Sequence, residues 1–140
     1  MRAPRGKALA GSSRAVIHRG VDIIRIAGIK SFGHHGALPE EKRLGQRFTV
    51  SVDLEIDTRP AAAADDLKLT VNYADVIRTV EAQLTGQPVY LIETLAQQIA
   101  ARILGTFTVV KAVTVEVNKP FAPVAAEFDA ISVKIRRERA

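Results

Sequence analysis

The sequence predicts an α+β fold, an antiparallel four-stranded sheet with two helices on one face. Three observations lead to this prediction. One segment alternates apolar and polar residues with the period of a strand, two consecutive segments repeat apolar residues with the period of a helix, and strand-like segments stand on both sides of these helices. Helices grouped between pairs of strands are typical of a sheet covered on one face, so the other face should be largely polar.

The first half of the sheet is predicted from residues 22–57. The isoleucines of Asp22–Phe32 indicate a strand, which runs into a loop over residues 33–41 with two glycines and a proline. The second strand opens at Gly45 and Gln46 and has the clearest alternation in the sequence. Its apolar face consists of Phe48, Val50, Val52, Leu54 and Ile56.

Two helices are predicted after an irregular link over residues 59–69. Asn72 is a suitable N-cap for the first helix, which ends at Gly86 and Pro88. The second helix, Pro88–Leu104, has the clearest helical period in the sequence and stops at Gly105. Its apolar stripe consists of Ile92, Leu95, Ile99 and Ile103.

Glu93 lies in the first turn of this second helix, among apolar neighbours. This stretch alone leaves two interpretations open. An acidic side chain favours a helix N-terminus because it complements the helix dipole. A partly buried carboxylate is also a good acceptor for a planar ligand with two adjacent N–H donors.

The last two strands are predicted over residues 109–118 and 130–137. In the first of them, Lys111 and three valines share one face, and Lys119 falls on that face immediately before Pro120. A proline does not continue a central strand, and the residue before it is extended. Lys119 should therefore project from the end of the strand, at the edge of an apolar surface.

Length and charge indicate one folded domain, residues 21–140, preceded by a basic segment. Residues 1–20 lack acidic residues and a clear period, so we expect a disordered extension, a transit peptide or a start site set too far upstream. The net charge of +5 resides in this segment, because basic and acidic residues balance in the remainder. A nucleic-acid surface should lie on the folded body, so nucleic acid is not an expected partner, and neither is a membrane.

Metal and thiol chemistry are not predicted. The sequence has no cysteine, which excludes disulfides and cysteine-bound zinc and fits a reducing compartment. His34 and His35 are adjacent, so in a strand they would point to opposite faces, and only His18 remains as a further histidine.

Four stretches taken together resemble one enzyme family. They are residues 32–48 (FGHHGALPEEKRLGQRF), 70–73 (TVNY), 91–95 (LIETL) and 115–120 (VEVNKP). In this order, on a ββααββ pattern, they resemble the dihydroneopterin aldolases of folate biosynthesis. The resemblance covers nearly all of residues 22–137. It implies the tunnelling fold, in which subunits form tetrameric barrels that stack into octamers.

The resemblance also implies catalytic roles for the residues at matching positions. Lys119 would be the catalytic acid/base. Tyr73 would shape the site and handle a proton at the reacting carbon. Glu41 would lie on a mobile loop over the substrate.

Substrate binding is implied for five further residues. Glu93 would bind the pterin through its 2-amino and ring N–H groups, next to Ile92. Thr70 and Val71 would lie against the pterin, contributed together with Tyr73 by a neighbouring subunit. His35 would support the loop through a hydrogen bond.

The implied reaction is a retro-aldol cleavage that needs neither metal nor cofactor. The substrate, 7,8-dihydroneopterin, contains a C=N bond that accepts the electrons released when the carbon–carbon bond of its side arm breaks, so the protein only moves protons and holds the ring. The products are 6-hydroxymethyl-7,8-dihydropterin and glycolaldehyde. We expect a cytoplasmic homo-oligomer.

Three alternatives stay open. An epimerase side activity is compatible with the same site. A dihydroneopterin-triphosphate epimerase would need cations for the phosphates, and Lys42 and Arg43 beside the loop could serve. A non-catalytic pterin-binding module is the third alternative, and the presence of both Glu93 and Lys119 argues against it.

Overall fold

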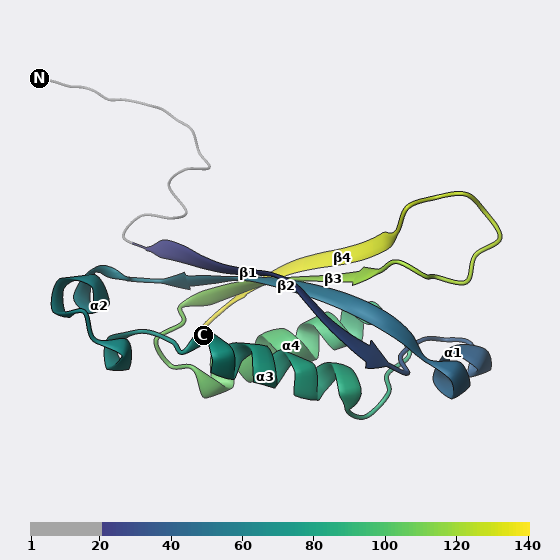
Figure 1. The fold of residues 1–140 in the computed structure, drawn as a ribbon, viewed down its shortest axis with the longest axis horizontal. Coiled ribbons are helices and arrows are strands. Elements are labelled where there is room, and N and C mark those ends of the chain that lie inside the picture. The colour runs from purple at the N-terminus through teal and green to yellow at the C-terminus, as the bar shows by residue number, and fades with distance from the viewer. Residues whose placement is uncertain (1–20) are drawn as a thin grey trace, which may run out of the picture.

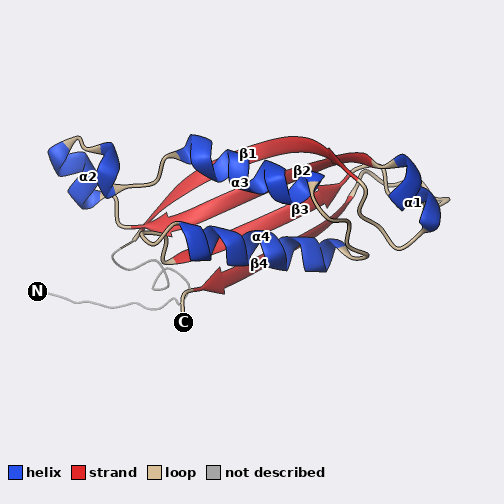
Figure 2. Cartoon of the chain, turned by 90° about the horizontal axis from the view of Figure 1, so that it is seen from below, coloured by secondary structure: helices blue, strands red, loops and turns tan. Residues whose placement is uncertain are grey.

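The computed structural model describes residues 21–140, so the expectation for residues 1–20 lies outside the described part of the protein. Two long helices lie side by side on one face of a four-stranded sheet, as predicted (Figure 1, Figure 2). The elements are β1 (Asp22–Gly33), α1 (Pro39–Leu44), β2 (Gln46–Ile56), α2 (Arg59–Ala64), the 3-10 turn η2 (Leu67–Leu69), α3 (Tyr73–Thr85), α4 (Ile92–Thr106), β3 (Ala112–Lys119) and β4 (Ile131–Glu138).

The sheet is antiparallel, with its strands in sequence order. The period of two in β2 places one side chain in every pair under α3 and α4, where Phe48, Val50, Val52 and Leu54 are fully buried. The opposite face is polar, as predicted, and includes the ion pair between Arg25 and Asp53 at 2.7 Å. Burial of apolar surface on one face contributes about 25 cal/mol per Å², and it fixes the register of the sheet.

Two short helices were not predicted. α1 begins in the segment predicted as a loop, residues 33–41, and continues beyond it, whereas α2 lies in the predicted irregular link. Both have a proline in the first turn, where its missing N–H is not needed, and α1 has acidic residues in its first turn and basic residues in its last. Helices of six residues are too short to be stable alone, so tertiary contacts decide whether they form.

The predicted ends of two elements were also wrong. α4 begins at Ile92 rather than Pro88, and it continues through Gly105 to Thr106. β3 begins at Ala112 rather than at residue 109, so Lys111 precedes the strand. Its backbone N–H still donates to the carbonyl of Glu55 at 2.8 Å, because the backbone runs beside β2 before the regular ladder starts.

β1 contains a β-bulge in its middle. Ile26 pairs with Val52 and Ile29 pairs with Val50, so Ala27 and Gly28 together oppose the single residue Ser51. Gly28 has φ +73°, which glycine adopts without strain, and its N–H donates to Ser51 Oγ at 3.0 Å.

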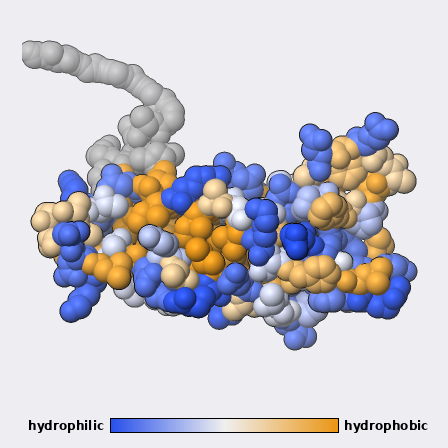
Figure 3. Space-filling model, in the orientation of Figure 1, coloured by the Kyte–Doolittle hydropathy of each residue, from blue (hydrophilic) through white to orange (hydrophobic). Residues whose placement is uncertain are grey.

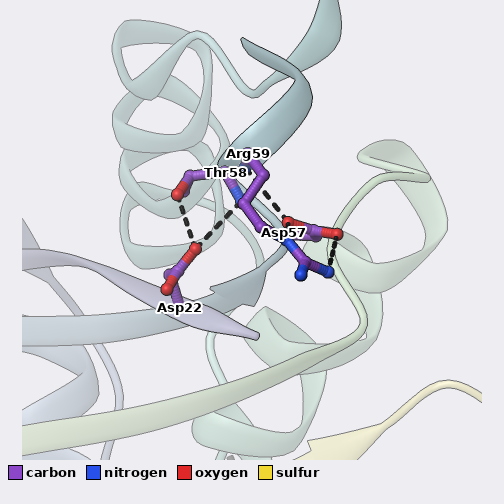
Figure 4. A network of polar contacts seen from close by, with 4 residues as sticks. All are labelled: Asp22, Asp57, Thr58 and Arg59. Carbon is purple, nitrogen blue, oxygen red and sulfur yellow. Dashed lines mark hydrogen bonds and ion pairs between the residues drawn. The ribbon is translucent and has the colours of Figure 1, made fainter. Parts of the chain in front are cut away.

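The end of the β1–β2 pair away from α1 is closed by polar contacts (Figure 4). The carboxylate of Asp22 accepts hydrogen bonds from the hydroxyl and the N–H of Thr58. The carboxylate of Asp57 accepts from Arg59 through the backbone and the guanidinium. The side-chain bonds from Arg59, ahead of its backbone bond, lower the pKa of Asp57 to about 2. These contacts hold the backbone where it leaves the sheet for α2.

Both edges of the sheet are open in the single subunit, because β1 and β4 each pair on one side only. An apolar area lies along the β1 edge above α3 (Figure 3). Ile23 is 46% exposed, and Ile24, Ile26 and Ile77 are partly buried. Among residues 21–140, no helix has the length and apolar character needed to cross a bilayer.

Candidate active site

Four of the predicted site residues meet at one end of the sheet. β3 ends there, α4 begins there, and α1 lies beside them (Figure 1). Glu41, Ile92, Glu93 and Lys119 line a shared pocket of about 310 Å³. The other lining residues are Ala37, Leu38, Tyr90, Leu91, Ala122, Pro123, Val124, Ile131 and Val133. The wall is therefore mostly apolar, with two carboxylates and one ammonium group.

Lys119 forms an ion pair with Glu41. The ammonium Nζ contacts Glu41 Oε2, and the side chains are only 13% and 6% exposed. The register of β3 with β4 places Lys119 opposite Ile131, and both residues line the pocket. The lysine therefore projects from the strand end at an apolar edge, as its position before Pro120 predicted.

The Glu41 carboxylate is held by several donors besides Lys119. Leu38 N–H donates to Oε1 at 3.1 Å, and Gln46 Nε2 lies 3.4 Å from Oε2. Burial raises the pKa of Glu41, but the hydrogen bonds from Lys119 and Leu38 outweigh it, so the pKa lies below its ordinary value. Gly36 packs against this side chain so closely that a Cβ would overlap the carboxyl group. The carboxylate is thus charged and fixed at neutral pH.

Glu93 also lines the pocket, from the first turn of α4. Its side chain is exposed, whereas Ile92 beside it is 8% exposed and anchors the turn in the core. Tyr90 lines the pocket as well, with its ring centroid 4.0 Å from Lys42 Nζ. An accessible carboxylate that faces an apolar cavity is suited to accept hydrogen bonds from a planar ligand.

His35 is completely buried and is not among the residues that line the pocket. Its Nε2 lies 2.8 Å from the carbonyl of Leu84, and its Nδ1 accepts from Val89 N–H at 3.1 Å. It supports the α3–α4 connection behind the pocket, so any part it has in substrate binding runs through the backbone.

Thr70, Val71 and Tyr73 lie at the other end of the molecule. Tyr73 begins α3, and Glu93 follows the connection after α3 ends at Thr85. A helix of 13 residues spans about 20 Å. Tyr73 is 62% exposed, and the other two residues line a separate hollow with residues 106–109. A single subunit therefore does not bring the eight predicted site residues together.

Sequence reasoning missed Gln46 and Tyr90. Gln46 occupies the core-facing register of β2, where every other position is apolar, and this break in the pattern was its signal. Its Oε1 is buried without a hydrogen-bond partner in the described residues. Tyr90 and the wall formed by residues 122–124 come from connections without a period, so the sequence carried no comparable signal for them.

Within residues 21–140, no three histidine or acidic side chains gather in the manner of a metal site. Lys119 and Glu41 are the buried charged pair of the pocket, so an amine that can act as an acid or a base is held in place by a carboxylate. The site can therefore bind a flat polar ligand and move protons at one end of it.

Sequence relatives of this protein are dihydroneopterin aldolases. The profile of the FolB family, dihydroneopterin aldolase, matches residues 24–136. A dihydroneopterin aldolase of Streptomyces coelicolor is 46% identical over 119 residues, which are 85% of this protein and 99% of that one. One from Bacillus subtilis is 38% identical over the same shares of both proteins.

Solved structures agree with these sequence relatives. E. coli dihydroneopterin aldolase in complex with neopterin has a TM-score of 0.76 at 28% identity, covering 83% of this protein and 98% of that one. A Burkholderia dihydroneopterin aldolase bound to guanine has a TM-score of 0.69 at 25% identity, covering 86% and 93%.

Proposed function

The protein belongs to the dihydroneopterin aldolase family, and from this premise we propose that its pocket binds the pterin ring of 7,8-dihydroneopterin and releases glycolaldehyde from the side arm. The activity is that of an aldehyde-lyase in folate biosynthesis. The observation that carries the site assignment is that Glu93 and Lys119, far apart in sequence, line the same pocket. The remaining product is 6-hydroxymethyl-7,8-dihydropterin.

Glu93 is the proposed pterin anchor. The ligands of the two solved relatives, neopterin and guanine, share a 2-amino-4-oxopyrimidine ring with adjacent N–H groups. A carboxylate accepts two such hydrogen bonds at once. Because Glu93 and Lys119 line the same pocket, a ring held by Glu93 would extend its side arm toward the lysine.

Lys119 and Glu41 are the proposed proton-transfer pair. Acting as the free amine and held in place by Glu41, Lys119 takes the proton of the substrate 2′-hydroxyl and becomes the ammonium. The C1′–C2′ bond then breaks, its electrons enter the ring C=N bond to give an enamine, and the Lys119 ammonium returns the proton to C1′. The buried ion pair supports this role because it keeps both groups in contact before substrate arrives. Gln46 would hold Glu41 in place.

We further propose that Thr70, Val71 and Tyr73 complete the pocket of a neighbouring copy, in tetrameric rings that stack into octamers. Three features support this. Tyr73 is too far from Glu93 in its own subunit, it is exposed, and the sheet has two open edges with an apolar area along β1 (Figure 3). We expect these oligomers to work in the cytoplasm.

Subunit mixing tests this arrangement. Tyr73→Phe and Lys119→Ala each damage a different half of the site, so each homo-oligomer should be slow. If the halves come from different copies, random mixed oligomers should regain activity at about a quarter of their sites. The measurement is turnover after co-refolding, with wild-type protein treated identically as the control. Mixed oligomers that form but stay as slow as the parents would contradict a shared site.

Activity itself is tested without added metal. The protein should convert 7,8-dihydroneopterin in EDTA, and borohydride should trap no lysine adduct, because the substrate supplies its own electron acceptor. Chromatography identifies the products formed in EDTA, and mass spectrometry of the protein detects any lysine adduct. Loss of turnover on chelation, or a reduced lysine adduct in the peptide map, would overturn the proposed mechanism.

A second candidate is epimerisation of dihydroneopterin triphosphate, and one observation favours it. The Lys42 ammonium stands over the Tyr90 ring at the pocket wall and has no carboxylate partner within residues 21–140. A cation placed there can receive a phosphate. Running the same assay with the triphosphate separates the two candidates, since cleavage and epimerisation give different products.

A further inference from the structure

His35 uses both ring nitrogens inside the protein. Nε2 lies 2.8 Å from the carbonyl of Leu84, which can only accept, and Nδ1 lies 3.1 Å from the N–H of Val89, which can only donate. These partners require the neutral ring with its proton on Nε2. Desolvation lowers the pKa of His35, and it outweighs the opposing bond to Leu84; charges on Lys42 and His34 lower it further.

The two bonds reach different elements. The carbonyl of Leu84 belongs to the last turn of α3. Val89 belongs to the extended connection that leads into α4, and its carbonyl also accepts from Gly36 N–H at 2.9 Å. Val89 is therefore clamped on both sides by adjacent residues of one segment. Three residues further on, Ile92 and Glu93 begin α4.

α4 needs an external support at this point. Its N-cap residue, Leu91, offers no side-chain hydrogen bond, whereas α3 is capped by Asn72. The two hydrogen bonds at Val89 therefore set the direction in which α4 begins. Gly36, the second half of that clamp, packs against Glu41, which also lines the pocket.

We propose that His35 is a positioning residue that sets the place of Glu93 in the pocket through its Nδ1 bond to Val89. This inference rests on the proposed function of Glu93 as pterin anchor. The competing role is that of a core histidine that fills space, since the ring also packs edge-on against Phe48 at 5.4 Å between centroids. The two roles differ in which nitrogen matters.

A matched pair of variants distinguishes the role of Nδ1 from that of Nε2. In His35→Asn, the amide oxygen falls near the position of Nδ1 and can still accept from Val89. In His35→Gln, the amide nitrogen falls near the position of Nε2 and can still donate to Leu84. Both variants lose the ring and its contact with Phe48, so they should be destabilised to a similar degree, and thermal unfolding of the complete protein checks this.

We expect His35→Gln to weaken the affinity for a pterin product analogue by about tenfold, and His35→Asn to stay within about threefold of wild type. In steady-state kinetics, His35→Gln should raise KM more than it lowers kcat, because Lys119 belongs to β3 and not to the clamped connection. Equal loss of affinity in both variants, in proportion to their loss of stability, would overturn the proposal and leave His35 as a core residue.

A double-mutant cycle distinguishes this proposal from the proposal that Glu93 anchors the pterin. If His35 acts through Glu93, adding His35→Gln to Glu93→Ala should not weaken binding further. If Glu93→Ala alone binds like wild type, the pterin assignment of Glu93 is wrong. If Glu93→Ala weakens binding and His35→Gln adds its full effect on top, Glu93 remains the anchor and His35 does not position it.

Discussion

Lys119→Ala is expected to lower turnover about a hundredfold or more while leaving pterin affinity close to that of the wild type. The lysine lies at the end of β3 with 13% of its side chain exposed and paired with Glu41, whereas the proposed anchor Glu93 belongs to α4. Removal of the amine takes away the proton carrier and leaves the anchor intact. Single-turnover rates measure the chemistry, and equilibrium titration measures binding.

Lys119→Arg is the matched control because it keeps a positive charge beside Glu41. A guanidinium group holds its proton at neutral pH, so this variant should be as slow as the alanine variant. If Lys119→Ala weakens binding as much as it slows the chemistry, the lysine is an anchor. The proton transfer would then have to be sought at Tyr73 and a bound water.

Glu93→Ala is expected to reduce the affinity for pterins by about 2–5 kcal/mol, counted as the cost of truncation. The carboxylate is the proposed acceptor in the pocket, so the ring N–H groups of the ligand would lose their partner. Titration with a product analogue measures the loss directly. Unfolding should change little, because the side chain is exposed.

Glu81→Ala provides the control for this experiment. Glu81 is an exposed acidic residue on α3 and does not line the pocket, so its removal changes the net charge equally without touching the site. A Glu93→Ala protein that binds as well as Glu81→Ala would return Glu93 to the role of a helix-terminus charge.

The parts of the fold that follow a regular period could be predicted from the sequence. The alternation in β2 and the apolar stripe of α4 each repeat over several turns or pairs, and together with the element order they predicted the α+β fold that the structure has. The position of Lys119 before Pro120 predicted its place at a strand end. These features depend on local residues, so local reasoning was sufficient.

The start of α4 could not be predicted in this way. Pro88 is a favourable first helical residue, but Val89 is held in the connection by His35 and Gly36, which lie about fifty residues earlier in the sequence. The same limit applies to the pocket wall, where residues 122–124 reach Leu38 only through the fold. Contacts between distant segments leave no period in the sequence.

The two short helices contain residues that favour a helix, but the glycines and prolines around them led to a prediction of irregular structure. α1 has a proline, two acidic residues and two basic residues in helical order, and α2 is mostly alanine, the best helix former. Glycines and prolines nearby favoured irregular structure. In α1, the hydrogen bond from Leu38 N–H to the Glu41 side chain stabilises the first turn of the helix. Glu41 is held in place because its carboxylate also pairs with Lys119.

One extra residue in β1 decides which side of the sheet all later side chains of that strand occupy. Because Ala27 and Gly28 oppose Ser51 alone, Ile29 returns to the core opposite Val50, and the same parity carries on toward His35. Deletion of either residue would turn this half of the strand over and withdraw the imidazole from Leu84. In the connection between β3 and β4, a change in length does not move strand side chains from one face of the sheet to the other. Over evolutionary time, changes in length should therefore accumulate at residues 125–130, which do not line the pocket, and be purged at residues 27 and 28.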